Sequence, residues 1–271
     1  MIKKLYAQKE IFLLLVFFLI ISLFLSSLFF NGWKSSWHFV NVQSMEPIFA
    51  DMRIIQGALK SESLGLNPWI NNPGDPWNRG FNYPSVWIDV GKTFNLDNEK
   101  FFFIFNLSIV SIYLLICLTL LLKTKSILLL LIIFSSSSLL IMERGNNDLV
   151  IFSIVYFSVN LLPLYSFFLL SLASFLKIYP LCLILAFLER KSVLFSFVIL
   201  GIIVIYLNIE ELKYIFLNTP KSEGQSYGSA AISIAFSKVF GINISEYLIS
   251  ALLVLSILIF YFMFKNKIKI N

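Results

Sequence analysis

The sequence predicts an all-α, polytopic membrane protein with about eight membrane segments, organised as a single membrane domain over residues 1–271. The chain is 58% hydrophobic and only 13% charged, and its mean hydropathy is +0.85. A soluble domain of this size does not have that balance. The apolar runs are also long and continuous, unlike the short alternating segments of a membrane β-barrel. Together these two observations give the fold class.

Five apolar runs have the length of complete spans. Each has 17 residues or more, which is about what a helix needs to cross the hydrocarbon layer. The first run is too long for a signal peptide and has no good cleavage site after it, so we expect the N-terminus in the cytoplasm. The five runs are 11–33, 101–122, 126–142, 192–209 and 246–264.

Basic residues at the ends of the runs set the orientation. The predicted cytoplasmic segments hold ten Lys and Arg against two acidic residues, and the outer segments hold eleven against thirteen. This is the positive-inside pattern. We therefore expect a multi-pass protein of the inner (plasma) membrane, surrounded by membrane lipids, with both termini cytoplasmic. The net charge of +6 follows from these clusters and does not indicate nucleic acid as a partner.

Residues 149–188 allow two interpretations, because they carry one charge, Lys177, and must run from the outer side to the cytoplasm. One interpretation is a long helix over 149–176 with Lys177 inside. The other is three passes that break near Pro163 and Pro180, where proline cannot continue a helix. The short pieces of the second form a broken hairpin within the protein.

The polar stretch 31–100 lies between the first two spans, and we expect it to fold as an extracytoplasmic cap. It holds seven acidic and six basic residues, all five tryptophans, and many prolines and glycines. A simple connection does not need this composition. A second outer loop is expected over 208–245.

The composition argues against two kinds of chemistry. His38 is the single histidine, so a histidine-ligated metal site or a catalytic triad with a His base would depend on one residue. Cys117 and Cys182 both lie in apolar runs, so no disulfide is expected. We expect neither a metal nor a cofactor.

Three polar features are candidates for chemistry. Asp51, near the start of the cap, is a possible general base; the alternative is a loop acid in a surface ion pair. Residues 143–148, Glu-Arg-Gly-Asn-Asn-Asp, combine an arginine that suits phosphate with amides that suit sugar hydroxyls; the alternative is an ordinary turn. Lys177 suits an anionic headgroup, or snorkels to the inner surface if the long helix forms.

These residues resemble the GT-C class of glycosyltransferases, and are most similar to the bacterial polyprenol-phosphate-sugar-dependent mannosyltransferase-like family (the DUF2029 or GT87 group). The likeness rests on four motifs in a shared order. They are Ala50-Asp51-Met52-Arg53, Tyr83-Pro84, Arg144-Gly145-Asn146-Asn147 and Lys177-Ile178-Tyr179-Pro180, with a looser fifth at Gly224-Gln225-Ser226-Tyr227. Ser85 follows Tyr83-Pro84 where the family has a second proline.

The resemblance implies a GT-C-like helical bundle and an inverting sugar transfer. A hexose, with mannose one possibility, would pass from a polyprenyl phosphate to a lipid-linked or envelope glycan on the extracytoplasmic side. Asp51 would be the base, and Arg144 and Lys177 would stabilise the phosphate. The resemblance also favours three passes over 149–188. The full set implied to bind donor phosphate or substrate is Arg53, Tyr83, Glu143, Arg144, Asn146, Asn147, Asp148, Lys177, Tyr179 and Gln225.

Two other functions use the same features. A carrier or flippase for lipid-linked sugars could hold phosphate with these cations and do no chemistry, although such transporters usually have two related halves. A non-catalytic subunit of an envelope-polysaccharide assembly is the third hypothesis. It is favoured if Asp51 and Arg144 lie far apart, whereas we expect Asp51, Arg144 and Lys177 to converge on one outer-facing cavity.

Overall fold

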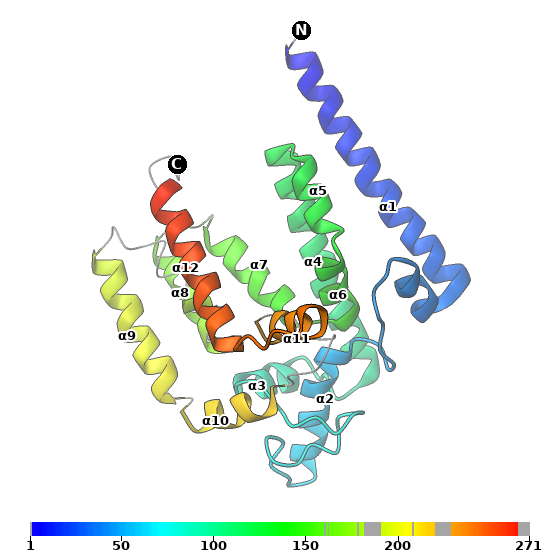
Figure 1. Cartoon of the computed structure of the whole chain (residues 1–271). Coiled ribbons are helices and arrows are strands. Elements are labelled where there is room, and N and C mark those ends of the chain that lie inside the picture. The colour runs from blue at the N-terminus through cyan, green and yellow to red at the C-terminus, as the bar shows by residue number, and fades with distance from the viewer. Residues whose placement is uncertain are drawn as a thin grey trace. The chain divides into compact units, whose positions relative to one another are not determined.

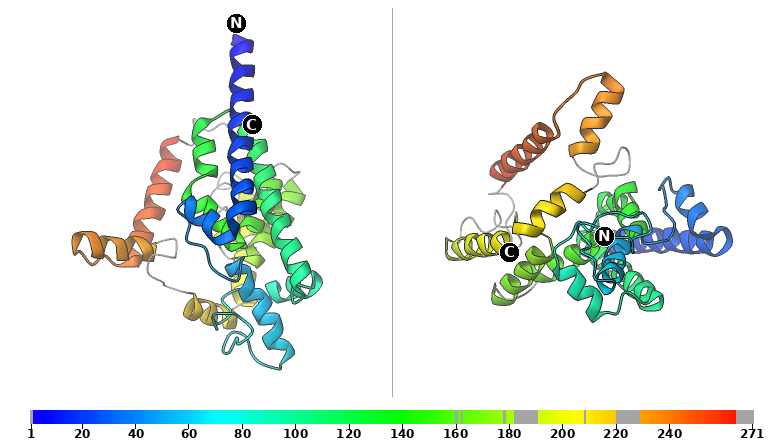
Figure 2. Two further views of the ribbon diagram at one scale, coloured as in Figure 1. Left: turned by 90° about the vertical axis from the view of Figure 1, so that its right-hand side faces the viewer. Right: turned by 90° about the horizontal axis from the view of Figure 1, so that it is seen from below.

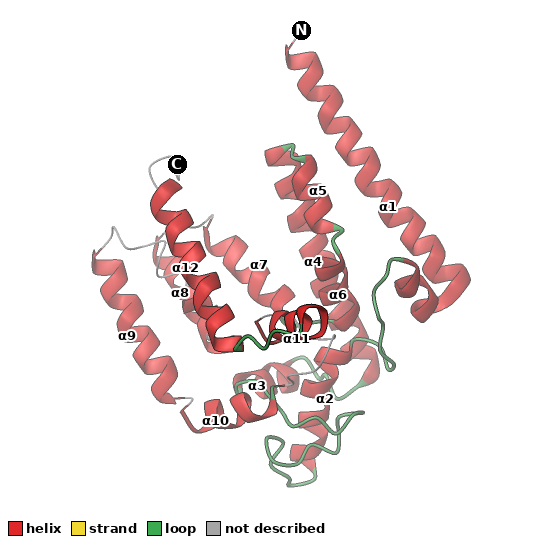
Figure 3. Cartoon of the chain, in the orientation of Figure 1, coloured by secondary structure: helices red, strands yellow, loops and turns green. Residues whose placement is uncertain are grey.

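The computed structural model describes residues 2–159, 161, 163–177, 179–181, 191–207, 209–219 and 229–264. Within these ranges every regular element is a helix, so the all-α prediction is confirmed (Figures 1 and 3). The helices are α1 (Ile2–Phe39), α2 (Ala50–Ser63), α3 (Val86–Thr93), α4 (Glu99–Thr124), α5 (Ile127–Ile133), α6 (Ser136–Arg144), α7 (Asp148–Val159), α8 (Pro163–Leu176), α9 (Lys191–Leu207), α10 (Ile209–Asn218), α11 (Ser229–Phe240) and α12 (Glu246–Phe264).

The chain forms two compact units, Met1–Asn218 and Thr219–Asn271. The boundary between them falls inside the predicted second outer loop. In the second unit α11 and α12 pack against each other, and the loop between them is held by Ser237 Oγ, which donates to Asn243 Oδ1 at 2.8 Å. Every described candidate for the functional site lies in the first unit.

Among the described residues, two helices are long and apolar enough to cross a membrane, Gln8–Phe39 within α1 and Glu99–Thr124, which is α4. The pair α5 and α6 makes a third stretch of this kind. These helices are what an integral helical membrane protein requires. The other predicted segments that the structure describes correspond to shorter helices, so the count of eight membrane segments stays a prediction.

The third stretch is bent by 40° between α5 and α6, which corrects the expectation of one continuous helix over 126–142. The cause is a serine at the break. Ser135 is the N-cap of α6, and its hydroxyl accepts a hydrogen bond from the backbone N–H of Ser138. A side-chain cap of this kind starts a new helix. The serine run at 135–138 therefore begins α6.

The first span ends at a kink at Gly32, where φ is 75° and ψ is 176°. Only glycine adopts this backbone conformation readily. Beyond the kink the last turns of α1 fold back beside the span. Ser27 Oγ donates to Ser36 Oγ at 2.9 Å, and the rings of Phe24 and Trp37 lie 4.5 Å apart. The chain therefore enters the cap from a fixed position.

The predicted cap is folded around α2 and α3, which pack together with the proline-rich loop between them (Figure 1). Its interior is aromatic and aliphatic: Met52, Ile55, Phe81, Trp87 and Leu96 are all fully buried. Burying a large apolar side chain contributes about 1.5–3 kcal/mol. A polar connection without such a core would have no fixed shape.

The loop crosses α2 at a pair of glycines. A Cβ on Gly57 would lie 2.5 Å from the backbone nitrogen of Asp75, and one on Gly74 would lie 2.3 Å from the carbonyl oxygen of Gly57. Two backbones can approach this closely only where neither carries a side chain. The crossing places residues 75–79 beside the N-terminus of α2.

Residues 149–176 form two helices that pack against each other, α7 and α8. The structure therefore excludes one long helix over this stretch. The second helix begins at Pro163, as the broken-hairpin interpretation expects. With 12 and 14 residues, each is about 20 Å long, too short to cross a bilayer. The third pass, 180–188, falls mostly outside the described residues.

The cap is fixed to the far end of this hairpin. The indole Nε1 of the buried Trp87 donates to the carbonyl oxygen of Leu176 at 2.9 Å. Helix α10 holds the cap from another side, because Glu211 accepts from the backbone N–H of Ser85 at 2.8 Å and Asn218 donates to the carbonyl oxygen of Trp69 at 2.6 Å. Lys177 consequently lies beside the cap.

Candidate functional site

Asp51 stands in the first turn of α2, and the turn is fixed from inside the protein. Phe49, which precedes the helix, has a left-handed backbone (φ 61°) and is fully buried between Trp33 and Phe102. The Asp51 side chain keeps 25% of its surface exposed. It is therefore held firmly by the backbone but remains open on one side.

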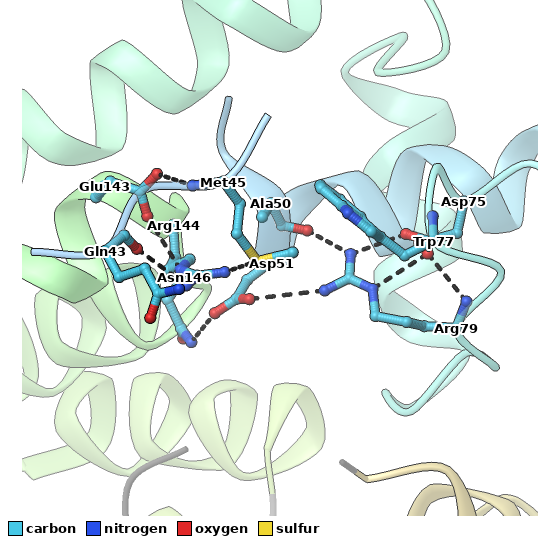
Figure 4. A network of polar contacts seen from close by, with 10 residues as sticks. All are labelled: Gln43, Met45, Ala50, Asp51, Asp75, Trp77, Arg79, Glu143, Arg144 and Asn146. Atoms are coloured by element: carbon cyan, nitrogen blue, oxygen red, sulfur yellow. Dashed lines mark hydrogen bonds and ion pairs between the residues drawn. The ribbon is translucent and has the colours of Figure 1, made fainter. Parts of the chain in front are cut away.

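Asn146 reaches Asp51 from the junction of α6 and α7, 95 residues further along the chain. Its Nδ2 donates to Asp51 Oδ2 at 2.7 Å (Figure 4). Its Oδ1 accepts from the backbone N–H of Asp148 at 2.8 Å, which fixes which end of the amide faces the carboxylate. The chain leaves α6 through Gly145 in a left-handed conformation, and this turn directs Asn146 toward the cap.

Glu143 and Arg144 are buried and hold the start of the cap against α6. Glu143 Oε1 accepts from the backbone N–H of Met45 at 3.0 Å and from the indole of Trp33 at 3.4 Å. Arg144 pairs with Glu143 at 3.0 Å and donates to the carbonyl oxygen of Gln43 at 3.2 Å. Glu143 is thus a structural residue here, although the sequence placed it in the binding set.

Lys177 and Tyr179, just beyond the end of α8, both bind Asp148 at the start of α7. Lys177 Nζ lies 2.5 Å from Asp148 Oδ1, and the Tyr179 hydroxyl donates to the same oxygen at 2.8 Å. The ammonium also lies 5.5 Å from the centre of the Tyr83 ring. These contacts place Lys177 at the end of the α7–α8 hairpin that lies near Asp51. They exclude a position of Lys177 at the opposite end of the hairpin.

Arg79 is the cation nearest to Asp51, and sequence reasoning missed it. Its Nη1 lies 3.9 Å from Asp51 Oδ1 (Figure 4). Its Nη2 donates to the carbonyl oxygen of Ala50 at 2.5 Å and to Asp75 at 2.8 Å. The loop around it has no periodicity that predicts this placement. The available signal was the Asp75–Arg79 spacing beside Trp77.

Arg53 was expected in the binding set, and the structure gives it another position. Its guanidinium is bound to Glu99 at 2.7 Å and Gln56 at 2.7 Å, and lies over the Phe102 ring at 4.2 Å. These contacts join α2 to the start of α4. Two residues along a helix turn a side chain by about 200°, so Arg53 points away from the Asp51 side.

Two further members of the predicted set have no assigned contact. Asn147 is buried, and within the described part of the chain its side-chain amide has no hydrogen-bond partner. Gln225 lies outside the described residues. Tyr83 is packed between Phe81 and Trp87, with its ring facing Lys177.

The burial and charges around Asp51 suit a general base, because they do more than hold the carboxylate in an ion pair. Burial raises the pKa of the Asp51 carboxyl above its ordinary value, and the hydrogen bond from Asn146 and the charges of Arg144, Arg79 and Lys177 oppose that rise. Burial, together with the nearby carboxylates of Asp51 and Asp148, raises the pKa of Tyr83 well above that of a free tyrosine. Tyr83 therefore stays protonated and neutral.

No protein-family model, no curated protein and no solved structure matches this chain. The site must therefore be interpreted from its own geometry. Among the described residues, no three His, Cys, Asp or Glu side chains are grouped to hold a metal ion. The arrangement does offer one partly open carboxylate, cations on different sides of it, and amide and aromatic groups around them.

Proposed function

We propose that the chain is a membrane glycosyltransferase of the GT-C class that transfers a hexose, such as mannose, from a polyprenyl phosphate to a lipid-linked or envelope glycan. One observation supports this most strongly. Asp51 lies 3.9 Å from Arg79 and binds Asn146, and the charges of Arg79, Arg144 and Lys177, which come from the cap, from α6 and from the end of α8, all act on its carboxyl. Sugar transfer from a lipid phosphate needs a base and a cationic phosphate site together.

In the proposed reaction Asp51 removes the proton from an acceptor hydroxyl while that oxygen attacks the anomeric carbon. The new C–O bond forms on one face of the sugar as the bond to the phosphate oxygen breaks on the other, so the anomeric configuration inverts. Polyprenyl phosphate leaves with the bonding electron pair. Asp51 then releases its proton to solvent through its exposed side.

Lys177 and Arg144 are the proposed phosphate ligands. The Lys177 ammonium has three donors and within the described residues uses one of them on Asp148, which leaves two for phosphate oxygens. Arg144 is fixed by Glu143 and the Gln43 carbonyl and contributes its charge from a rigid position. Charges that are already in place stabilise a leaving group without reorganisation.

The membrane arrangement is part of the proposal: about eight segments in an inner membrane, both termini cytoplasmic, and the cap outside. Lys125 Nζ, just after α4, lies 2.6 Å from Glu10 in the N-terminal part of α1. The start of the first span and the end of the second thus lie together, as two antiparallel crossings require. The short hairpin of α7 and α8 supports the family resemblance, which includes a broken hairpin.

The test is a mass profile of lipid-linked and envelope glycans. It compares cells that lack the protein with cells complemented by wild type, Asp51→Asn or Asp97→Asn, all at equal membrane abundance. Asp97 is an exposed acid of the same cap and serves as the matched control. We expect one sugar unit to be missing without the protein and with Asp51→Asn, and present with wild type and Asp97→Asn.

The carrier hypothesis gives a different result in the same experiment. A carrier needs its phosphate-binding cations but has no proton to remove, so Asp51→Asn would restore the full glycan while Lys177→Met would not. A full glycan with Asp51→Asn would therefore exclude the transferase.

A further inference from the structure

Arg79 and Asp51 are spaced so that a single hydroxyl beside them can bridge the guanidinium and the carboxylate. Arg79 Nη1 and Asp51 Oδ1 are 3.9 Å apart, too far for a direct hydrogen bond. An oxygen between them would accept from the guanidinium at about 2.9 Å and donate to the carboxylate at about 2.7 Å. Because these two lengths together exceed 3.9 Å, such an oxygen lies to the side of the line that joins Nη1 and Oδ1, about 2 Å from that line.

The guanidinium of Arg79 is positioned to donate a hydrogen bond from Nη1 toward Asp51. Its Nε and Nη2 are used by Asp75, at 3.1 and 2.8 Å, and Nη2 also by the Ala50 carbonyl. Within the described residues Nη1 makes no hydrogen bond and faces Asp51 (Figure 4). Asp75 is itself buried and bound by the backbone N–H groups of Trp77 and Arg79. The donor is therefore fixed before any ligand arrives.

The surroundings of this gap suit a neutral sugar better than an anion. Here two carboxylates, Asp75 at 2.8 Å and Asp51 at 3.9 Å, face the single guanidinium of Arg79, so the local charge is negative and repels a phosphate or carboxylate. The half-buried Trp77 ring packs on the guanidinium at 4.6 Å and adds an aromatic face of the kind that covers sugar rings. Asn146 and Arg144 lie on the other side of Asp51 (Figure 4).

We propose that Arg79, Asp51 and Trp77 form a binding site for a neutral saccharide, and that one of its hydroxyls bridges Arg79 Nη1 and Asp51 Oδ1. This inference rests on the proposed function, because it identifies the bridging hydroxyl with the acceptor hydroxyl. It also gives the site a direction. The acceptor enters from the side of loop 75–79, and the phosphate of the donor binds on the side of Arg144 and Lys177.

The experiment measures binding, so it does not depend on turnover. The purified protein in nanodiscs is titrated with methyl α-mannoside, methyl α-glucoside and methyl α-galactoside, followed by saturation-transfer difference NMR. Methyl α-glucuronide is the charged control. We expect at least one neutral hexoside to bind more tightly than the glucuronide. Arg79→Lys and Trp77→Leu should each weaken it about tenfold or more, as the loss of a charge-assisted hydrogen bond or a stacking face does.

Lys177→Met is the matched control, since it removes a cation from the other side of Asp51; we expect it to keep hexoside affinity and lose affinity for undecaprenyl phosphate. Retained undecaprenyl phosphate binding shows that the Arg79→Lys and Trp77→Leu proteins are folded. Equal hexoside affinity in wild type and both variants overturns the proposal, as does tighter binding of the glucuronide. The two proposals can fail separately. If Arg79→Lys weakens hexoside binding but cells with Asp51→Asn make the full glycan, the saccharide site is supported and the transferase function is excluded.

Discussion

Asp51 and Arg53 stand two residues apart on α2 and have opposite kinds of surroundings. The Arg53 guanidinium is satisfied at hydrogen-bond distance by Glu99 and Gln56. Asp51 has one close partner, Asn146, while the nearest cation, Arg79, stays 3.9 Å away. A charge whose partners are all in place serves the fold. A charge that is held by the protein and still keeps an unmatched side is available to a ligand.

The strongest test of this comparison is Asp51→Asn. If the open side of α2 is catalytic, removing the base should lower the transfer rate by about 10²–10⁴-fold. The amide has nearly the same shape, so the melting temperature should change little. The measurement is transfer from undecaprenyl-phosphate hexose in membranes, with Asp97→Asn at wild-type rate. A rate within twofold of wild type would show that the open carboxylate is not the base.

The next largest effect is expected where the loop crosses the helix. Gly57→Ala places a methyl group 2.5 Å from the backbone of Asp75, and overpacking of this kind costs about 1–3 kcal/mol. Because the crossing positions Arg79, transfer should fall together with the melting temperature. Ser63→Ala, on the exposed end of the same helix, is the control for both measurements. An unchanged melting temperature for Gly57→Ala would contradict the crossing.

Arg53→Met tests the satisfied side of α2. The variant loses the contacts to Glu99 and Gln56, and we expect a cost of about 1–2 kcal/mol, because Glu99 is mostly exposed and its charge is screened. Thermal unfolding in nanodiscs measures this. The rate per folded molecule should stay near that of wild type, and a rate loss as large as that of Asp51→Asn would place Arg53 in the site after all.

The smallest expected effect is a displacement of the pH profile. A base must be deprotonated, so the rate should fall as the pH drops through the raised pKa of Asp51. Asn146→Leu removes the hydrogen bond that lowers this pKa; the pKa then rises further, and the acidic limb moves to higher pH. The rate should recover at alkaline pH. Asn71→Leu, at an exposed cap position, should keep the wild-type profile, and an unmoved limb in Asn146→Leu would separate Asn146 from the base.

The sequence predicted the meeting of distant segments better than the details of the cap. The alternation of spans and loops put Asp51 and residues 143–148 on one side of the membrane, and the structure places Asn146 on Asp51. The hairpin interpretation likewise put Lys177 there. The contact between these segments was predictable because a membrane limits where each polar segment can lie, while the side of the membrane on which they lie stays a prediction.

Arg79 and Arg53 show where sequence reasoning failed. The position of Arg79 depends on the contact between Gly57 and Gly74, and no local pattern in a proline-rich loop predicts a crossing of this kind. Arg53 was assigned to the site because it belongs to the same four-residue motif as Asp51. On a helix, side chains two positions apart point in different directions. Had a helix been predicted over the residues of α2, Arg53 would have been separated from Asp51.

The bond from Trp87 to Leu176 joins residues 89 positions apart, and it has a consequence for how the protein is made. A ribosome completes the cap well before it reaches α8. The nascent cap therefore emerges with the Trp87 indole and the Asp51 carboxylate still without their later partners, Leu176 and Asn146. The order of synthesis thus leaves the candidate site incomplete until the helices that follow the cap have been made.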